Sequence, residues 1–398
     1  MRHRFTKVLL VLLALATLGG TTAVAARSQH SAASPYKVGI IYCRTGALAE
    51  YGAEYIEGLK LGLTYATNGT NAVNGHPIQL NIQDETANPA TAVSEAKTLI
   101  GQGYKILAGT CSSATALQLG PLAAQNQVLY ISGAAAYDGI TGMNKYTFRA
   151  GRQSHQDVLA AQSFLGKGVG KNILVFAQDY AFGQGNVAAV QAVMGSRGHH
   201  VSSILVPLSA TDFTPFAQQA AKAKPDLLFV AWAGTTAPAM FQALQQQGVF
   251  GETTVTTGLA QRDTWQGFGA AAGQIKFLAH YVWNGPHNKV NDWLVAQMRK
   301  RGQLPDLFTP DGFVTSQMIV HALQAAKGDQ NVDAMISGLQ GWQFLAPKGV
   351  QRIRPQDHAM IQPMFQVQLV KQANGKYTDK VLKTISPGNV QPPVTPFK

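Results

Sequence analysis

A regular alternation of short apolar runs and longer helical segments constrains the fold of this chain most strongly. From residue 36 to residue 257, the apolar runs have the length of buried strands, and the segments after most of them have helical spacing. Strands that alternate with helices form parallel sheets joined by right-handed crossovers. The pattern changes over near residues 149–151. The sequence therefore predicts an α/β protein with two similar halves, each built on a parallel sheet.

The positions of the apolar residues also predict the individual elements. Tyr51, Tyr55, Leu59 and Leu63 recur at spacings of four, which places them on one face of a helix. The expected strands are 36–42, 78–83, 104–108, 128–131, 146–149, 172–177, 201–207, 227–231, 253–257, 277–282, 350–354 and 362–370. The expected helices are 47–66, 88–100, 113–125, 154–167, 185–197, 213–223, 237–247, 288–301 and 311–326, and residues 386–398 are expected to form a loose tail.

The stretch from residue 104 to residue 138 carries the clearest signal of a binding site. A buried strand ends at Gly109, and Ser112 and Ser113 follow where a helix begins. The first N–H groups of a helix have no partner within it and lie at the positive end of its dipole, so they bind carboxylates or phosphates. A second strand then ends in a turn of small residues, 133–136. Two neighbouring strand ends predict a small-molecule site at this sheet edge, although both serines can equally serve as helix caps.

Composition and charge exclude several classes of protein. The chain of 398 residues is long enough for about two domains, and its 46% apolar and 13% charged residues indicate a folded globular protein. The net charge of +12 is scattered along the chain, and its longest basic block is residues 299–301. We therefore expect no nucleic acid as a partner.

The first 26 residues have the pattern of a secretory signal peptide. Arg2, Arg4 and Lys7 precede an apolar run from residue 8 to residue 18, and small residues follow it. The run is too short to span a bilayer stably. No cysteine follows it, so a lipid anchor is not expected. These residues predict cleavage of the signal and a location in the periplasm or outside the cell.

The chain has two cysteines, Cys43 and Cys111. Each follows an expected strand, so the two can lie side by side at one sheet edge. In an oxidising compartment they can form a disulfide, which would stabilise the fold by about 4 kcal/mol. The alternative is two unpaired thiols. Two cysteines without a histidine at ligand spacing do not predict a metal site.

Motifs for cofactor binding and catalysis are weak or missing. Residues 183–188 match G-x-G-x-x-A, but this segment does not directly follow its strand, and no acid lies about 20 residues beyond it. The sequence contains no P-loop, no H-E-x-x-H and no G-x-S-x-G motif. We therefore expect no cofactor, no catalytic residues and no enzymatic activity.

Five segments taken together resemble the leucine/isoleucine/valine-type solute-binding proteins of bacterial ABC transporters. They are residues 44–52, 109–116, 131–141, 179–185 and the pair 357–358, and the similarity in element order runs from about residue 36 to 370. The resemblance implies a type 1 periplasmic binding protein, with two doubly wound parallel-sheet lobes joined by three hinge crossings and a ligand held between them. Lobe one would comprise 36–149 plus 280–346, and lobe two 150–279 plus 347–385.

The resemblance also implies which residues bind the ligand. Ser113 would take a ligand carboxylate at the helix start, and Ala135 would offer backbone atoms. Tyr51 would line the pocket for the ligand side chain, and Phe182 would enter from the second lobe. The other candidates are Ser112, Ala136, Tyr137, Tyr180, Thr236 and Leu259.

Leu259 departs from the pattern of the amino-acid binders in this family. Those proteins place an acidic residue at about this position, where it pairs with the ligand's ammonium group. Burying an ammonium group without a counter-charge costs several kcal/mol. We therefore expect a small carboxylate without an α-ammonium group, either aromatic or aliphatic, with a branched-chain amino acid as the alternative.

Two functions are compatible with these expectations. The first is a monomeric binding protein that delivers its ligand to the permease subunits of an ABC importer. The second is a ligand-sensing subunit of the same fold that acts on a membrane receptor. The residues alone do not separate the two functions.

Overall fold

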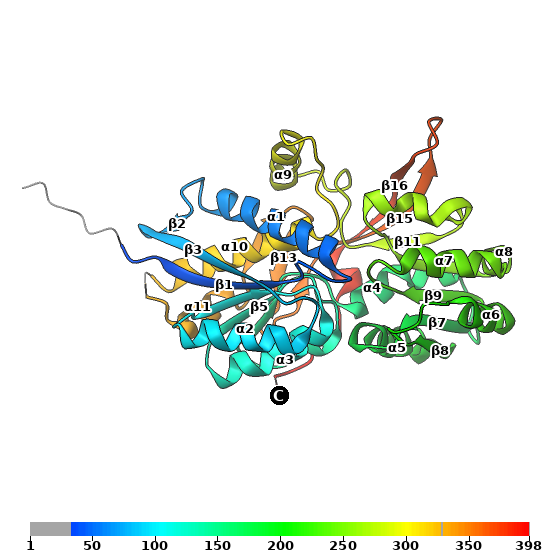
Figure 1. The fold of residues 1–398 in the computed structure, drawn as a ribbon, viewed down its shortest axis with the longest axis horizontal. Helices are drawn as coiled ribbons and strands as arrows, with labels where there is room; N and C mark the ends of the chain where they lie inside the picture. Colours follow the sequence, from blue (N-terminus) through cyan, green and yellow to red (C-terminus); the bar gives the residue numbers. More distant parts are fainter. Residues whose placement is uncertain (1–32, 328, 398) are drawn as a thin grey trace, which may run out of the picture. The chain divides into compact units, whose positions relative to one another are not determined.

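The computed structural model describes residues 33–327 and 329–397, so the expected signal peptide, 1–26, lies outside the described residues. Within them the chain forms two α/β lobes, each with a central sheet between layers of helices (Figure 1). This confirms the predicted fold class. Among the described residues, no helix has both the length and the apolar character needed to cross a membrane.

The first lobe is built on a sheet in the order β2-β3-β1-β4-β5-β6. All neighbours in it are parallel except the edge pair β2 and β3. Every residue of β4 and β5 is buried, as expected for central strands covered on both faces. The strands are β1 (Tyr36–Tyr42), β2 (Ala72–Val73), β3 (His76–Asp84), β4 (Ile106–Gly109), β5 (Leu129–Ser132) and β6 (Thr147–Arg149).

Helices cover both faces of the first sheet. On one face, Tyr55 and Leu59 of α1 join a core with residues of α10 and α11. Helices α1 and α10 approach so closely that a Cβ atom on Gly58 would overlap the carbonyl oxygen of Thr309. On the other face α2 begins at the cap Asn88, whose side chain accepts from the N–H of Ala90. The helices are α1 (Ala49–Ala66), α2 (Pro89–Gly101), α3 (Ser113–Gln125), α9 (Lys289–Arg299), α10 (Thr309–Ala325) and α11 (Val332–Leu339).

The second lobe contains a sheet in the order β16-β15-β11-β10-β9-β7-β8. The strands from β7 to β11 are parallel, whereas β15 and β16 extend the sheet as antiparallel neighbours. The strands are β7 (Asn172–Gln178), β8 (His200–Val206), β9 (Leu227–Ala231), β10 (Thr254–Gly258), β11 (Lys276–Ala279), β15 (Met364–Lys371) and β16 (Tyr377–Ile385).

The helices of the second lobe also form two layers. Apolar residues of α4 and α5 pack on one face of its sheet, and those of α6, α7 and η4 pack on the other. The helices are α4 (Ser154–Ala161), α5 (Ala181–Val193), α6 (Thr214–Ala223), α7 (Ala237–Gln246), α8 (Val249–Glu252) and the 3-10 segments η2 (Gln162–Leu165), η3 (Gly195–Arg197), η4 (Arg262–Gly273) and η5 (Pro387–Val390).

Three crossings connect the lobes, and the third lies later than expected. The first follows β6 and the second follows β11. The hairpin of β12 (Gln343–Ala346) and β13 (Gly349–Ile353) continues into β14 (Met360–Ile361), and all three belong to lobe one. Ile353 and Met360 are fully buried in its core, so the third crossing falls between Met360 and Met364 rather than near Pro347.

The segment after β16 is not the loose tail that the sequence suggested. Val390 is fully buried in the core of lobe two. The guanidinium of Arg354 then donates to the carbonyls of Pro392 and Pro393, at 2.6 and 2.9 Å. The carboxylate of Asp357 accepts from the N–H of Thr395 at 3.0 Å. These hydrogen bonds anchor the tail to lobe one, so it links the lobes a fourth time.

Candidate functional site

A cavity of about 300 Å³ lies between the two lobes. Its wall comes from the loops that follow β4 and β5 of the first sheet and β7, β9 and β10 of the second. In open parallel sheets these carboxyl ends of strands are the usual position of a ligand. The volume is at the lower end of the range for small-molecule sites. The cavity is therefore the candidate ligand site.

Most of the predicted residues lie in the cavity wall. Those that line it are Tyr51, Ser113, Ala136, Tyr180, Phe182 and Leu259. Ser112, Ala135, Tyr137 and Thr236 are not part of the wall. The side chain of Ser112 caps α3 by accepting from the N–H of Thr115 at 3.4 Å, and Thr236 accepts from the indole N–H of Trp232 at 2.9 Å.

Arg149 stabilises the turn after β5 by donating hydrogen bonds to its carbonyl groups. Its buried guanidinium donates to the carbonyls of Ala135 at 2.8 Å and Tyr137 at 3.3 Å, and to the hydroxyl of Thr141 at 2.9 Å. Burial lowers the pKa of Arg149 to about 10, and the carboxylate of Asp138 opposes that shift. The carbonyls of Ala135 and Tyr137 thus accept hydrogen bonds from Arg149. The sequence had suggested that backbone atoms of Ala135 would contact the ligand.

The start of α3 is occupied by a carboxylate of the protein itself. Glu85 is fully buried, and the hydroxyl of Thr110 donates to it at 2.5 Å. Burial raises the pKa of Glu85, whereas hydrogen bonds from Cys43, Thr110, Thr115 and the backbone of Cys111 lower it. A carboxylate of the protein itself thus already lies beside the start of this helix.

Ser113 keeps a role at the cavity despite this arrangement. Its hydroxyl oxygen accepts from the N–H of Tyr137 at 3.2 Å, and the residue lines the cavity. A serine hydroxyl has one proton to donate. Because the oxygen serves as the acceptor for Tyr137, that proton is left to donate to a ligand.

The two cysteines are free in the structure, so the expected disulfide is not formed. The thiol of Cys43 is turned toward Glu85 and donates to its carboxylate at 2.7 Å. Burial raises the pKa of Cys43, and the neighbouring Cys111 raises it further. Cys111 is half-buried and lines the cavity. The prediction that the two lie at adjacent strand ends is confirmed, because β1 and β4 are paired.

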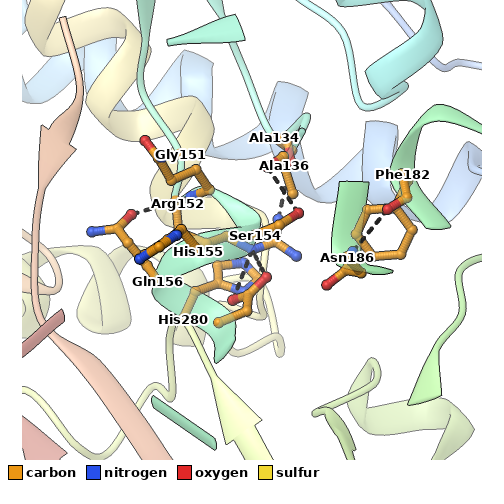
Figure 2. A network of polar contacts seen from close by, with 12 residues as sticks. Ala134, Ala136, Gly151, Arg152, Ser154, His155, Gln156, Phe182, Asn186 and His280 are labelled. Atoms are coloured by element: carbon orange, nitrogen blue, oxygen red, sulfur yellow. Dashed lines mark hydrogen bonds and ion pairs between the residues drawn. The ribbon is translucent and has the colours of Figure 1, made fainter. Parts of the chain in front are cut away.

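Arg152 was not among the sequence candidates. It follows the first crossing, and among the described residues it is the one Lys or Arg in the cavity wall. Its guanidinium donates to the carbonyl of Ala134 at 3.1 Å (Figure 2). It also pairs with the carboxylate of Asp157 at 3.3 Å. It also lies over the ring of Phe308, 5.9 Å from the centroid. In the sequence, the only indication that Arg152 belongs to the site was its position just beyond the changeover between the halves at 149–151.

The rest of the wall is mainly aromatic. Trp232, Phe229, Phe241 and Phe268 come from lobe two, and Phe308 comes from the segment before α10. Figure 2 shows Phe182 and Asn186 on α5, apart from the group around Arg152 and Ser154. Such a wall favours an apolar ligand body, and the polar groups select its orientation.

Tyr51 closes the cavity from lobe one. Its ring stacks on Phe308 with centroids 4.4 Å apart. Its hydroxyl oxygen accepts from the backbone N–H of Gly234, on lobe two, at 3.0 Å. Burial raises the pKa of Tyr51 to about 12, so the hydroxyl stays protonated at neutral pH. The structure therefore represents the two lobes in contact across the cavity.

The site contains no grouping typical of a metal centre. Among residues 33–327 and 329–397, no set of three or more His, Cys, Asp or Glu side chains is placed to hold a metal ion. What the geometry offers is a partly open, mainly apolar cavity whose wall contains one guanidinium, the carboxylates of Glu50 and Asp157, and several hydrogen-bond donors.

Comparison with known proteins agrees with this arrangement. The family described as periplasmic binding protein matches residues 35–376. The chain belongs to the periplasmic binding protein family. This binding protein is similar to a solved ABC-type branched-chain amino acid transporter protein from Rhodopseudomonas palustris, with 30% identity, a TM-score of 0.76 and coverage of 91% of this chain and 100% of that one.

The chain is also similar to further solute-binding proteins. A solute-binding protein of an ABC transporter from R. palustris, solved in complex with 4-hydroxybenzoate, has 23% identity and a TM-score of 0.80, covering 89% of this chain and 97% of that one. The Leu/Ile/Val-binding protein BraC3 of Rhizobium johnstonii is 23% identical over 335 residues, which is 82% of this chain and 89% of that protein.

These comparisons confirm the family resemblance inferred from the sequence. The protein is a solute-binding protein of the ABC-transporter type, with the type 1 fold. The family is one of solute-binding proteins.

Proposed function

We propose that the protein captures a small carboxylate between its lobes and delivers it to an ABC importer. The observation that carries the proposal is the cavity between the lobes, whose mainly apolar wall contains the guanidinium of Arg152. A guanidinium binds a carboxylate through charge-assisted hydrogen bonds, which are stronger than neutral ones. The proton of the Ser113 hydroxyl supplies a second donor.

Asp157 affects how much of this charge a ligand meets. Its carboxylate is paired with Arg152 at 3.3 Å, and both side chains are nearly buried. Burial raises the pKa of Asp157 and the guanidinium opposes that shift. The pair leaves only some of the guanidinium N–H groups for a ligand. A single carboxylate group on the ligand matches that limited capacity better than a dianion.

The ligand body is proposed to be aromatic or aliphatic and to lack an α-ammonium group. Leu259 lies in the wall and provides no counter-charge at its own position. Of the two carboxylates in the wall, Glu50 and Asp157, the second is already paired with Arg152. Structures that share this fold at 20 to 24% identity were solved with benzoate, 4-hydroxybenzoate and 3,4-dihydroxybenzoate. Branched-chain amino acids remain the alternative, because the relative with 30% identity is described as a branched-chain amino acid transporter.

A thermal-shift screen of the purified protein tests this proposal. The compounds are benzoate, 4-hydroxybenzoate, 3,4-dihydroxybenzoate, short aliphatic acids, leucine, isoleucine and valine. A ligand that binds only the folded state raises the melting temperature in proportion to ln(1 + [L]/Kd). Stabilisation by one class of acid supports the proposal, and a flat response to every compound at millimolar concentration contradicts it.

Replacement of Arg152 by Gln is expected to weaken binding of the acid found in the screen by about 10- to 150-fold. This range corresponds to the loss of roughly 1.5–3 kcal/mol for hydrogen bonds to a charged group. Isothermal titration calorimetry measures the change. Arg299→Gln, at an exposed position outside the cavity wall, is the control and should bind as the wild type does. Equal affinity of the Arg152 variant would remove this residue from the site.

The proposed partners are a small-molecule ligand and the permease subunits of an importer, with the protein acting as a periplasmic or secreted monomer without cofactor. N-terminal sequencing of the exported protein tests cleavage of the signal near residue 26.

Mass spectrometry of the released ligand tests whether the protein leaves it chemically unchanged, because an altered product would indicate catalysis. Ligand uptake that survives deletion of the gene would favour the sensing role over delivery.

A further inference from the structure

One buried carboxylate lies where the three crossings of the chain meet. Asp311, on α10 of lobe one, is fully buried. The ammonium group of Lys348 donates to its Oδ1 atom at 2.7 Å and to Gln362, on the third crossing, at 3.0 Å. A Cβ atom on Gly151, on the first crossing, would lie 3.1 Å from Oδ2 of Asp311. The hinge is therefore assembled around this side chain.

His280 brings the second crossing to the same carboxylate. It follows β11, and its Nε2 atom lies 3.7 Å from Oδ2 of Asp311, too far for a hydrogen bond. Neither atom has a hydrogen-bond partner among the described residues, and both residues are more than nine-tenths buried. His280 also lines the cavity, and its ring tilts against Phe308 with centroids 5.1 Å apart. Figure 2 shows it in the group around Arg152 and Gly151.

Two unpaired buried polar atoms that face each other are costly, because each has lost its hydrogen bonds to water. The backbone of Leu307 accepts a hydrogen bond from the ring, and because Nε2 has no partner, the neutral ring carries its proton on Nδ1. A second proton, added to Nε2, would let the imidazolium donate to Oδ2 and would satisfy both atoms at once. The charged groups around the ring are Arg152 after β6, Asp157 on α4, Asp311 on α10 and Lys348 between β12 and β13. Burial lowers the pKa of His280 well below its usual range, and the charges of Arg152 and Lys348 lower it further.

A ligand anion changes this balance. Bound beside Arg152, it cancels much of the positive charge that opposes protonation of the ring. The attraction of Asp311 is then opposed by burial and by the charge of Lys348, and no longer by the full charge of Arg152.

We propose that His280 takes up one proton when an organic anion binds in the cavity, and that the imidazolium then donates to Asp311. The proton comes from solvent and adds to the Nε2 lone pair, and no covalent bond to the ligand forms. The inference rests on the proposed function, because it needs an anionic ligand in this cavity. The resulting ion pair ties the second crossing to α10 and so favours the arrangement with the lobes together.

Proton uptake makes ligand affinity depend on pH in a definite direction. Because the complex holds more protons than the free protein and ligand, Kd rises as pH rises, by up to about tenfold per pH unit. The dependence disappears below the pH at which free His280 is already protonated. It also disappears above the pH at which the complex loses its proton.

Calorimetry in buffers of different ionisation enthalpy measures the uptake directly. The probe is whichever acid of the screen raises the melting temperature most, with 4-hydroxybenzoate run first, at about pH 6.5, the ordinary pKa of histidine. We expect uptake of up to one proton for each acid bound. His280→Gln, whose amide can donate to Asp311 without a proton, should bind with no uptake. His321→Gln, at a half-buried histidine of α10 outside the cavity, should keep it.

Each outcome decides the inference. An acid that binds without proton uptake overturns it and leaves the proposed function intact. Uptake that persists in His280→Gln overturns it as well. If no acid binds, both fail together. If His280→Gln does not fold, the ring nitrogen chemical shifts of histidine in the wild type decide: the complex must show one imidazolium more than the free protein.

Discussion

His358 stacks on Phe148 with ring centroids 3.6 Å apart and an angle of 9° between the planes. Its Nδ1 atom lies 2.9 Å from the carbonyl of Thr147, and the amide of Gln340 lies 3.1 Å from Nε2. A neutral ring that donates from Nδ1 and accepts at Nε2 satisfies both partners. Burial lowers the pKa of His358 to about 4, although Thr147 and Asp357 oppose the shift. The residue therefore stabilises the fold as the neutral form.

This shift predicts a loss of stability in mild acid. The unfolded chain binds a proton at His358 near pH 6.5, and the folded protein does so only near pH 4. The stabilisation is thus fully present above pH 6.5 and is lost as pH falls toward 4, by about 3 kcal/mol. Urea unfolding of wild type and His358→Asn between these values measures it. The free energy of unfolding of His358→Asn should depend less on pH. His200→Asn, at an exposed position, is the control and should show the pH dependence of the wild type. Parallel curves for wild type and His358→Asn would contradict the prediction.

The sequence predicted those residues of the cavity wall that lie in the segments resembling the family. Ser113, Ala136 and Phe182 follow strands whose ends could be located from the apolar pattern. Arg152 could not be found in this way, because its place depends on how the first crossing enters α4. Glu85 was missed for a similar reason: only the pairing of β3, β1 and β4 brings its carboxylate to the start of α3.

At the scale of elements, the junction between β4 and α3 depends on one glycine. Gly109 has φ of +113°, a conformation that residues with side chains rarely adopt. A Cβ atom there would also overlap the carbonyl oxygen of Ile41 on β1. The close pairing of β1 and β4 therefore requires glycine at this position.

Gly109→Ala is expected to destabilise the protein by more than the roughly 1 kcal/mol that a strained backbone conformation alone costs. The overlap forces β1 and β4 apart, which adds to the conformational cost. Gly103→Ala is the matched control, because Gly103 has φ of +84° but nothing within 4 Å of its Cβ position. Chemical denaturation of both variants measures the difference. Equal losses would show that the contact with Ile41 contributes nothing.

Strands and helices with strong periodicity could be predicted well. β9 (Leu227–Ala231) matches its expected range, and α3 (Ser113–Gln125) does too. The elements that were missed are short or have weak patterns, and they include β2, β12, β14, β16, α8, α11 and η4. Residues of β16 alternate poorly because Asp379 is buried and Leu382 is exposed. Pairing with β15 rather than local sequence defines it.

For the whole molecule, the contact between Tyr51 and Gly234 predicts how strongly the lobes hold together. Tyr51→Phe removes the acceptor for the N–H of Gly234 and leaves the stacking on Phe308. The loss of one neutral hydrogen bond should shift the equilibrium toward the open state by roughly 0.5–1.5 kcal/mol, or about 2- to 12-fold.

Small-angle X-ray scattering of the ligand-free protein measures this shift as a larger radius of gyration. Tyr377→Phe is the matched control, because the Tyr377 hydroxyl donates to the carbonyl of Gly269 within lobe two. That variant should scatter as the wild type does. An unchanged radius for Tyr51→Phe would show that the contact does not determine closure.

The two lobes and the first two crossings could be predicted, because the family resemblance fixed their order along the chain. The third crossing and the anchored tail could not. Both depend on side chains that find partners far away in sequence, such as Arg354 with Pro392. Val350–Arg354 reads as a strand in either lobe, and only the burial of Ile353 in the first core decides between them.

The packing of α1 against α10 has a consequence for the timing of synthesis. Tyr55 and Leu59 bury their side chains together with Val314 and Met318, so lobe one stays incomplete until the ribosome has passed α10. The second sheet is likewise incomplete until β15 has been synthesised and can pair with β11. Neither lobe can complete its core early, so we expect the nascent chain to stay largely unfolded until late in synthesis. A polypeptide in that condition can still thread through a narrow translocation pore.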